Sequence, residues 1–161
     1  MERNADTPGV IAPPPLMLLA SFILGFAISA AAPLGLLADL PVAARYGAGG
    51  ALCAAAIALA LSAVGRFGAA KTPVNPYYAP VSLVTTGVFS HLRNPMYVSF
   101  YVLSLGLAIA FASEALILTT VVLAIAIHYG VVRREEAFLE RKFGEEYRQY
   151  KARIPRYGWR F

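Results

Sequence analysis

The chain has 161 residues, of which 58% are apolar and only 14% are charged, and its formal net charge is +5. Soluble domains carry about 25% charged residues, so this composition argues against a surface that is wholly exposed to water. An excess of Lys and Arg is typical of cytoplasmic segments that contact anionic lipids. None of the nucleic-acid-binding patterns is present, and we therefore expect membrane lipids and no nucleic acid as partners.

The first residues predict a polar tail followed by a membrane span. Residues 1–14 are polar and rich in proline, and we expect them to be disordered. The uncharged run over residues 15–37 exceeds the roughly 20 residues that a bilayer core requires. A cleaved signal peptide is the alternative, because residues 30–32 are three alanines. The tail carries two acidic residues beside one arginine and so lacks the positive charge of a signal peptide, which favours a retained helix.

Three further apolar runs follow. Residues 47–65 are rich in Ala and Gly, which let helices approach closely in lipid. Prolines and charges interrupt residues 66–95, which predicts a long ordered loop. The Asn94-Pro95 pair predicts a helix start, and we expect spans over 96–112 and 115–132, joined by a tight turn into an antiparallel hairpin.

The distribution of Lys and Arg predicts the orientation. The 66–95 loop has three of them and residues 133–161 have nine, whereas the 38–46 loop has one and the 113–114 turn has none. The positive-inside rule then places the loop and both termini in the cytoplasm, as four spans require. The Ala and Gly content hints at a bacterial source, for which the membrane would be the inner membrane.

Residues 133–161 predict a cytoplasmic helical tail. The fourth span continues into water, and Gly144 is placed to end that helix. A second helix follows, with an apolar stripe at Phe143, Tyr147, Tyr150 and Ile154, and we expect it to be amphipathic and to lie on the membrane surface. The expected fold is an all-α integral membrane protein, a single domain with four transmembrane helices and this amphipathic helix.

No Walker loop, GxGxxG, GxSxG or HExxH motif is present, and two histidines are too few for most metal sites, so we predict no metal site. Polar residues instead gather at 87–97 and 128–140, the cytoplasmic ends of the predicted hairpin. Residues 83–97, LVTTGVFSHLRNPMY, resemble the Gly-Pro-Tyr/Phe…Arg-His/Asn-Pro-x-Tyr signature of the isoprenylcysteine carboxyl methyltransferase and phospholipid methyltransferase superfamily. Glu135-Glu136 and the residues up to Ile154-Pro155 are similar to its second signature. Asn94 and Val88 replace the usual His and Pro, and Asn is typical of bacterial members.

The resemblance covers about residues 71–157 and implies a membrane methyltransferase that uses S-adenosylmethionine and releases S-adenosylhomocysteine. The implied acceptor is lipophilic or small: an isoprenylcysteine-like carboxylate, a lipid amine or a thiol. The donor needs an acidic partner for its ammonium or ribose, and a cation or helix N-terminus for its carboxylate. The candidate catalytic residues are Glu136 and Arg133. The candidate cofactor-binding residues are Gly87, His91, Arg93, Asn94, Tyr97, His128, Glu135 and Glu136.

Simpler explanations exist for each candidate. Arg93 and Tyr97 also suit membrane-interface anchors, Glu135 and Glu136 suit a solvated helix face, and His128 suits a buried histidine with a backbone partner. His128 lies seven residues before Glu135, so an α-helix would place these two on one face; we favour Glu136 as the cofactor ligand, with Glu135 second. A non-catalytic membrane scaffold or transporter subunit is the alternative function, and the oligomeric state stays open.

Overall fold

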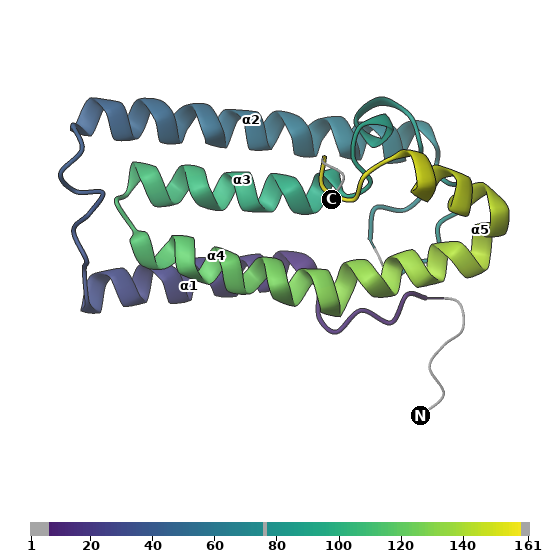
Figure 1. Ribbon diagram of the computed structural model, residues 1–161, viewed down its shortest axis with the longest axis horizontal. Coiled ribbons are helices and arrows are strands. Elements are labelled where there is room, and N and C mark those ends of the chain that lie inside the picture. The colour runs from purple at the N-terminus through teal and green to yellow at the C-terminus, as the bar shows by residue number, and fades with distance from the viewer. Residues whose placement is uncertain (1–6, 76, 159–161) are drawn as a thin grey trace. The chain divides into compact units, whose positions relative to one another are not determined.

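The computed structural model describes residues 7–75 and 77–158, and the regular elements in these ranges are helices (Figure 1). The all-α prediction is therefore confirmed for this part of the chain. The elements are α1 (Pro14–Ala31), α2 (Val42–Ala69), a 3-10 helix (Gly87–Ser90), α3 (Pro95–Ala110), α4 (Glu114–Ile127), a π-turn (His128–Val132) and α5 (Arg133–Arg153).

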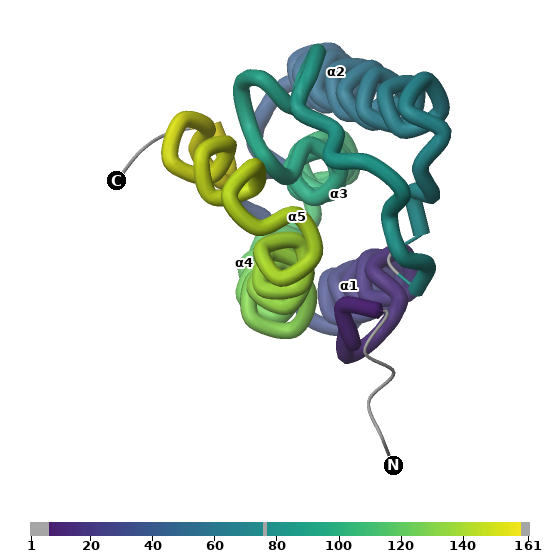
Figure 2. The backbone as a smooth tube through the Cα atoms, turned by 90° about the vertical axis from the view of Figure 1, so that its right-hand side faces the viewer, coloured from purple at the N-terminus to yellow at the C-terminus, as the bar shows by residue number. Residues whose placement is uncertain are grey.

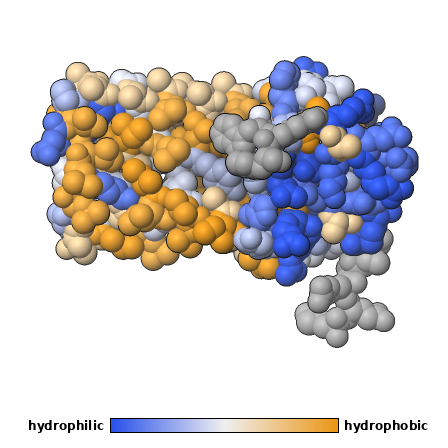
Figure 3. Space-filling model, in the orientation of Figure 1, coloured by the Kyte–Doolittle hydropathy of each residue, from blue (hydrophilic) through white to orange (hydrophobic). Residues whose placement is uncertain are grey.

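The chain forms two compact units. The apolar unit contains Pro13–Ala58 and Tyr97–Ile127, and the polar unit contains the described residues of Met1–Ala12, Leu59–Met96 and His128–Phe161. In Figure 3 the surface over α3 and α4 is mainly hydrophobic, whereas the surface over α5 is mainly hydrophilic. The polar unit is thus assembled from three segments that are far apart in the sequence.

Three helices in the described ranges are long and apolar enough to cross a membrane: α1, α2 and the run Glu114–Arg153, in which α4, the π-turn and α5 follow one another. They make the chain an integral membrane protein with helical spans. The α3 helix is apolar but has 16 residues, about 24 Å at 1.5 Å per residue, which is shorter than a hydrocarbon core of about 30 Å. Four spans are therefore not confirmed by helix length.

The first two helices have different bounds from those predicted. The α1 helix ends at Ala31 rather than at residue 37, because Pro33 cannot donate a backbone hydrogen bond and Gly35 has a φ of 80°. The α2 helix extends beyond the predicted 47–65 at both ends. Arg45 and Arg66 lie inside it, since a charged residue ends an apolar run without breaking a helix.

Small residues set the helix contacts of the apolar unit. The α1 and α4 helices lie side by side (Figure 2), and a Cβ on Gly25 would stand 2.8 Å from the Leu116 Cα atom. In the same way, a Cβ on Gly49 would stand 2.6 Å from the Gly106 carbonyl oxygen, across the contact between α2 and α3. Close approach at small residues is how helices gain packing energy in lipid, as the Ala- and Gly-rich run predicted.

In the polar unit, α5 has a sharp kink. Gly144 has non-helical dihedral angles, φ 54° and ψ −122°, so the helix after Glu135 and Glu136 ends there and a second one follows. This confirms the predicted break. The apolar stripe of the second helix is used differently from the prediction: Tyr147 and Tyr150 are 2% and 4% exposed, because they pack inside the unit. An amphipathic helix on the membrane surface is therefore not confirmed.

The 70–94 segment is an ordered connection, as predicted. The Thr72 hydroxyl accepts a hydrogen bond from the Val81 N–H at 2.7 Å, which closes the first part of the segment. Further on, Phe89 is buried against Phe67, with ring centroids 5.2 Å apart. The Tyr150 hydroxyl donates to the Phe89 carbonyl at 2.7 Å, which fixes the segment to the second half of α5.

The described part of the N-terminal tail is bound to the polar unit, so the prediction of a disordered tail is wrong for it. The Ile11 N–H donates to the Gly130 carbonyl at 3.2 Å, and Arg134 Nη1 donates to the Gly9 carbonyl at 2.8 Å. Apolar Val10 between them is buried. Residues 1–6 lie outside the described ranges, as do 159–161 of the predicted C-terminal tail and Pro76 of the loop.

Candidate functional site

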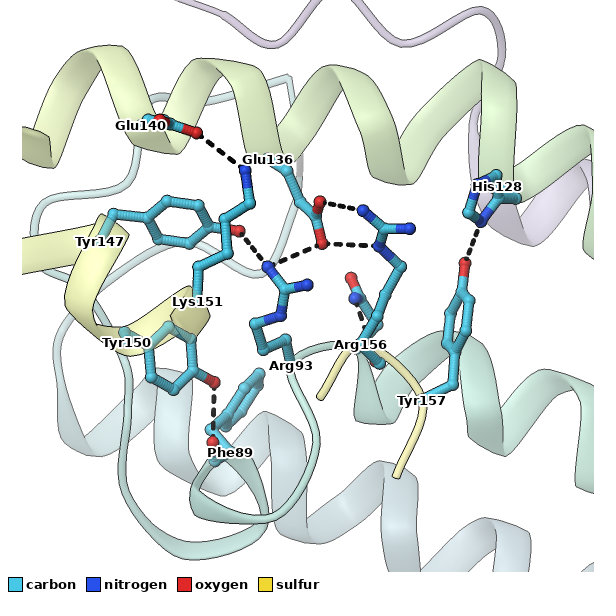
Figure 4. A network of polar contacts seen from close by, with 11 residues as sticks. Phe89, Arg93, His128, Glu136, Glu140, Tyr147, Tyr150, Lys151, Arg156 and Tyr157 are labelled. Carbon is cyan, nitrogen blue, oxygen red and sulfur yellow. Dashed lines mark hydrogen bonds and ion pairs between the residues drawn. The ribbon is translucent and has the colours of Figure 1, made fainter. Parts of the chain in front are cut away.

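Glu136 is the centre of a buried ion-pair cluster in the polar unit (Figure 4). Arg93 Nη1 lies 3.1 Å from Glu136 Oε1, and the two side chains are each 8% exposed. Arg156 approaches the same carboxylate with Nε 2.9 Å from Oε1 and Nη2 2.6 Å from Oε2. Two guanidinium groups thus share one carboxylate, so the cluster carries a net charge of +1.

The backbone brings Arg93 and Arg156 together. Arg93 and Asn94 come directly before α3, and α5 ends at Arg153, so both guanidinium groups belong to non-helical chain. The Arg93 N–H donates to the Pro155 carbonyl at 3.0 Å, and Asn94 Nδ2 donates to the Arg156 carbonyl at 3.3 Å. These two bonds hold the segment after α5 beside the start of α3, which explains why Asn94 is buried.

Tyr147 borders the cluster. Its hydroxyl accepts a hydrogen bond from Arg93 Nη1 at 3.4 Å. Burial and the nearby Glu136 carboxylate raise the pKa of Tyr147 above that of a free tyrosine, while Arg93 opposes this shift. The hydroxyl is therefore neutral at physiological pH and adds no negative charge to the cluster.

A second polar pair lies beside the cluster in Figure 4. His128 Nδ1 is 2.9 Å from the Tyr157 hydroxyl. Burial raises the pKa of Tyr157 to about 12, so the hydroxyl keeps its proton and can donate it to Nδ1. The partner of His128 Nδ1 is thus a side chain of the segment after α5. It is not a backbone group, which was the simpler explanation for this histidine.

His128 shares its helix face with Glu136, which corrects the predicted pairing with Glu135. In an α-helix, residues eight positions apart diverge by about 80° and residues seven apart by about 20°. The π-turn His128–Val132 accommodates one additional residue. Every later residue is therefore turned back by about 100° around the helix axis, which brings Glu136 to within about 20° of His128. Figure 4 accordingly shows His128 and Glu136 pointing to the same side of the helix, whereas Glu135 is only half-buried.

Other predicted residues lie outside the cluster. His91 is exposed, and its Nδ1 is 3.1 Å from the Ser90 hydroxyl. Gly87 has a φ of 63° and packs against the Arg66 side chain, which fills the place of a Cβ. Glycine is required there by the backbone and by this contact, so the structure gives Gly87 a packing role.

Arg133 and Tyr97 make other contacts. Arg133 is exposed, and its guanidinium carbon is 5.6 Å from the centre of the Tyr129 ring, at the distance of a cation–π contact. Tyr97 belongs to the apolar unit and packs edge-to-face against Phe100, with ring centroids 6.1 Å apart. Of the predicted residues, the structure therefore joins Arg93, Asn94 and Glu136 into one network and places His128 beside it.

Sequence reasoning missed Arg156 and Tyr157. Both follow Ile154-Pro155, the last part of the second signature, and a basic and an aromatic residue directly after a signature are signals that could have been used. It placed Tyr147 in the second signature and in an apolar stripe, but gave it no role in the site. A buried tyrosine needs a partner for its hydroxyl, and Arg93 is that partner.

The fold and the cluster define a helical integral membrane protein with a buried, net-positive polar site. Residues 44–146, more than half of the chain, match the phospholipid methyltransferase family, PEMT, and the chain belongs to this family. Its members are S-adenosylmethionine-dependent methyltransferases. The predicted superfamily, enzyme class and methyl donor are thereby confirmed at the level of the family.

The chain is also similar to the protein-S-isoprenylcysteine O-methyltransferase of Schizosaccharomyces pombe. The two are 30% identical over 73 residues, which are 45% of this chain and 31% of the relative. The chain thus matches about a third of the relative's length. Within the family match, Arg93 and Glu136 lie inside the matched residues, whereas Arg156 and Tyr157 follow them.

Proposed function

We propose that this chain transfers a methyl group from S-adenosylmethionine to a lipophilic or small acceptor, and that the Arg93–Glu136–Arg156 cluster is part of the donor site. The observation that supports this most strongly is the joining of the two signatures. Arg93 comes from the first and Glu136 from the second, and their side chains form a buried ion pair at 3.1 Å.

The residues of the cluster fit the amino-acid part of the donor. The negative carboxylate of the donor complements the net charge of +1 on the cluster. In addition, Arg93 Nε is buried without a hydrogen-bond partner among the described residues. Such an orphaned donor calls for a further acceptor. Arg93 and Arg156 would hold the carboxylate by charge-assisted hydrogen bonds. A carboxylate offers about four lone-pair sites, so Glu136 keeps capacity for an ammonium or ribose hydroxyl.

Methyl transfer requires chiefly binding and orientation from the protein. When bound, S-adenosylmethionine supplies a methyl group that an acceptor atom can attack in line. The chain's own residues then orient the reactants and exclude water. Glu136 keeps both guanidinium groups in fixed directions, and the His128–Tyr157 hydrogen bond adds a fixed polar group beside them.

We propose three acceptor classes: a lipid amine, which fits the family's description, an isoprenylcysteine-like carboxylate, which fits the relative's name, and a small thiol, which the superfamily resemblance implies. We propose that a lipophilic acceptor enters from the bilayer and the donor from the cytoplasm, with the 66–95 loop and both termini on that side. The Lys and Arg counts of the loops support this orientation. Assays with labelled donor and one acceptor of each class distinguish the three.

Calorimetric binding of S-adenosylhomocysteine to the detergent-purified protein tests the donor site. We expect micromolar affinity for the parent and a loss of at least about tenfold in Arg93→Ala and Glu136→Gln, since a hydrogen bond to a charged group contributes about 1.5–3 kcal/mol. Arg148→Ala is the matched control, because Arg148 pairs with Glu145 on the surface of the same unit. Its affinity should equal that of the parent.

The non-catalytic scaffold predicts a different result. A parent protein that is folded, as shown by circular dichroism and a cooperative thermal transition, and that binds no S-adenosylhomocysteine would contradict the proposal. If the parent binds and both cluster variants bind equally well, the methyltransferase assignment stands, but the cluster is not part of the donor site.

A further inference from the structure

The π-turn His128–Val132 lies between α4 and α5, and the N-terminal segment Gly9–Ile11 is bound to it. A π-turn interrupts the regular ladder of α-helical hydrogen bonds, so a carbonyl in it is open to a donor from outside the helix. The Gly130 carbonyl accepts such a bond from the Ile11 N–H, at 3.2 Å.

Two further contacts hold the same segment. The Ile11 side chain lies directly over Gly130, where a Cβ would collide with its Cδ1 and Cγ1 atoms. One helical turn further on, Arg134 Nη1 binds the Gly9 carbonyl at 2.8 Å. The segment therefore contacts the π-turn through its backbone and through a side chain that only a glycine admits.

This contact bears on the candidate site because the π-turn decides which acid shares a face with His128. With the π-turn, His128 and Glu136 are aligned to within about 20°; without it, the aligned acid would be Glu135. The described N-terminal residues touch the one element on which this alignment depends.

We propose that Gly9–Ile11 is a positioning element of the proposed methyltransferase site: by binding Gly130 it stabilises the π-turn and so keeps His128 on the face of Glu136. Ile11 and Gly130 are positioning residues. They act through the helix register, and the consequence for donor binding rests on the proposed function, whereas the effect on the register does not.

The register can be measured without any ligand. The chain has two histidines, His91 and His128, so ¹⁵N-histidine labelling gives one set of ring signals for each. His128 Nδ1 bonds the Tyr157 hydroxyl, and Tyr157→Phe supplies the reference signal for the loss of that bond. His91 is exposed and serves as the internal control.

Three single variants and one double variant separate the contacts. Ile11→Pro removes the N–H that binds Gly130, whereas Ile11→Ala keeps this N–H and shortens the side chain. Gly130→Ala places a methyl group against Ile11 while favouring helix formation by itself. The double variant Ile11→Ala/Gly130→Ala removes the collision.

In Ile11→Pro and Gly130→Ala we expect the His128 ring signals to move toward those of Tyr157→Phe, with His91 unchanged. Ile11→Ala and the double variant should resemble the parent. Affinity for S-adenosylhomocysteine should fall about fivefold in the first two, the effect of one misplaced hydrogen bond. Folded Ile11→Pro and Gly130→Ala proteins with parental His128 signals would overturn the proposal.

The outcomes also separate this inference from the proposed function. If the His128 signals respond as expected but the parent binds no S-adenosylhomocysteine, the positioning role stands and the methyltransferase assignment fails. If the parent binds and the His128 signals do not respond, the assignment stands and the positioning role fails.

Discussion

Arg156 binds the Glu136 carboxylate with both arms of its guanidinium group, Nε to Oε1 at 2.9 Å and Nη2 to Oε2 at 2.6 Å. This fork matches the planar geometry of a carboxylate. The hydrogen bond to Glu136 raises the pKa of Arg156 above its ordinary value, so the guanidinium group stays charged at any physiological pH. The contact fixes the segment after α5 to the helix that carries Glu136.

Replacing Arg156 by lysine should weaken this contact although the charge is kept. An ammonium group is a point charge and cannot bond both carboxylate oxygens in the fork geometry. We expect Arg156→Lys to lower the affinity for S-adenosylhomocysteine about tenfold, the loss of one charge-assisted hydrogen bond. Arg148→Lys, at an exposed ion pair, should be neutral; equal losses in both variants would show that the fork is unimportant.

Glu136→Gln should destabilise the protein strongly. It leaves Arg93 and Arg156 near each other without the shared negative charge, and breaking a buried ion pair costs about 3–5 kcal/mol; the 32% exposure of the Arg156 side chain lowers the expected cost to about 3 kcal/mol. Thermal or denaturant unfolding in detergent measures the loss. The double variant Glu136→Gln/Arg156→Gln should recover part of it, because one of the unpaired cations is gone. A double variant less stable than the single one would contradict this account.

Stability should fall above about pH 10. Burial raises the pKa values of Tyr147 and Tyr150 and brings that of Tyr157 to about 12. An unfolded tyrosine ionises near pH 10, so above this pH the folded state binds more protons than the unfolded state. The stabilisation is therefore complete below pH 10 and is lost as the pH rises toward the folded-state values, with a slope of at most about 1.4 kcal/mol per pH unit per tyrosine.

Unfolding measured at intervals from pH 8 to pH 11.5 checks this slope, and Tyr157→Phe should reduce it. Phenylalanine has no proton to lose, so the variant separates tyrosine ionisation from general alkaline unfolding. An unchanged slope in Tyr157→Phe, Tyr147→Phe and Tyr150→Phe would disprove the assignment to these hydroxyl groups.

Gly144→Ala should destabilise the kink in α5. Gly144 has a φ of 54° and a ψ of −122°, a conformation that residues with a side chain rarely adopt and that costs them about 1–3 kcal/mol. The control is Gly68→Ala in α2, a helical position with open space around it, which should be neutral or more stable by up to about 1 kcal/mol. Comparison of the two unfolding free energies isolates the backbone effect, and a stabilised Gly144→Ala would show that the kink is not required.

Local signals predicted those parts of the structure that depend on a few neighbouring residues. The Asn94-Pro95 pair marks the start of α3, and Gly144 marks the break in α5, because each residue type restricts its own backbone. The charges Arg45 and Arg66 were less informative about helix ends, since a helix passes from lipid into water without ending. The buried acid is Glu136, the one of the two glutamates that the sequence analysis favoured, and its role as a cofactor ligand stays a prediction.

The contacts that complete the site depend on longer-range geometry. The π-turn at His128 has no simple sequence signal, and without it the helix period pairs His128 with Glu135. The position of Arg156 beside Arg93 depends on the backbone bond between Arg93 and Pro155, which joins residues 62 positions apart. Tyr147 and Tyr150 have the spacing of an apolar stripe on a membrane-surface helix. The sequence does not show whether such a stripe is buried in protein or in lipid, whereas the hydrogen bonds of the two hydroxyl groups, to Arg93 and to the Phe89 carbonyl, place it inside the protein.

Arg156 and Tyr157 reach Glu136 and His128 from one short non-helical segment that leaves α5 after Arg153, and Lys151 and Arg153 are exposed. A protease that cuts after basic residues would therefore find accessible sites just before this segment. A single cut after Arg153 would separate both partner side chains from α5 at once, while α1 to α4 stayed covalently intact. Limited trypsin digestion should thus be slowed by anything that tightens the Arg156–Glu136 contact, which makes the rate of this cut a simple report on the state of the site.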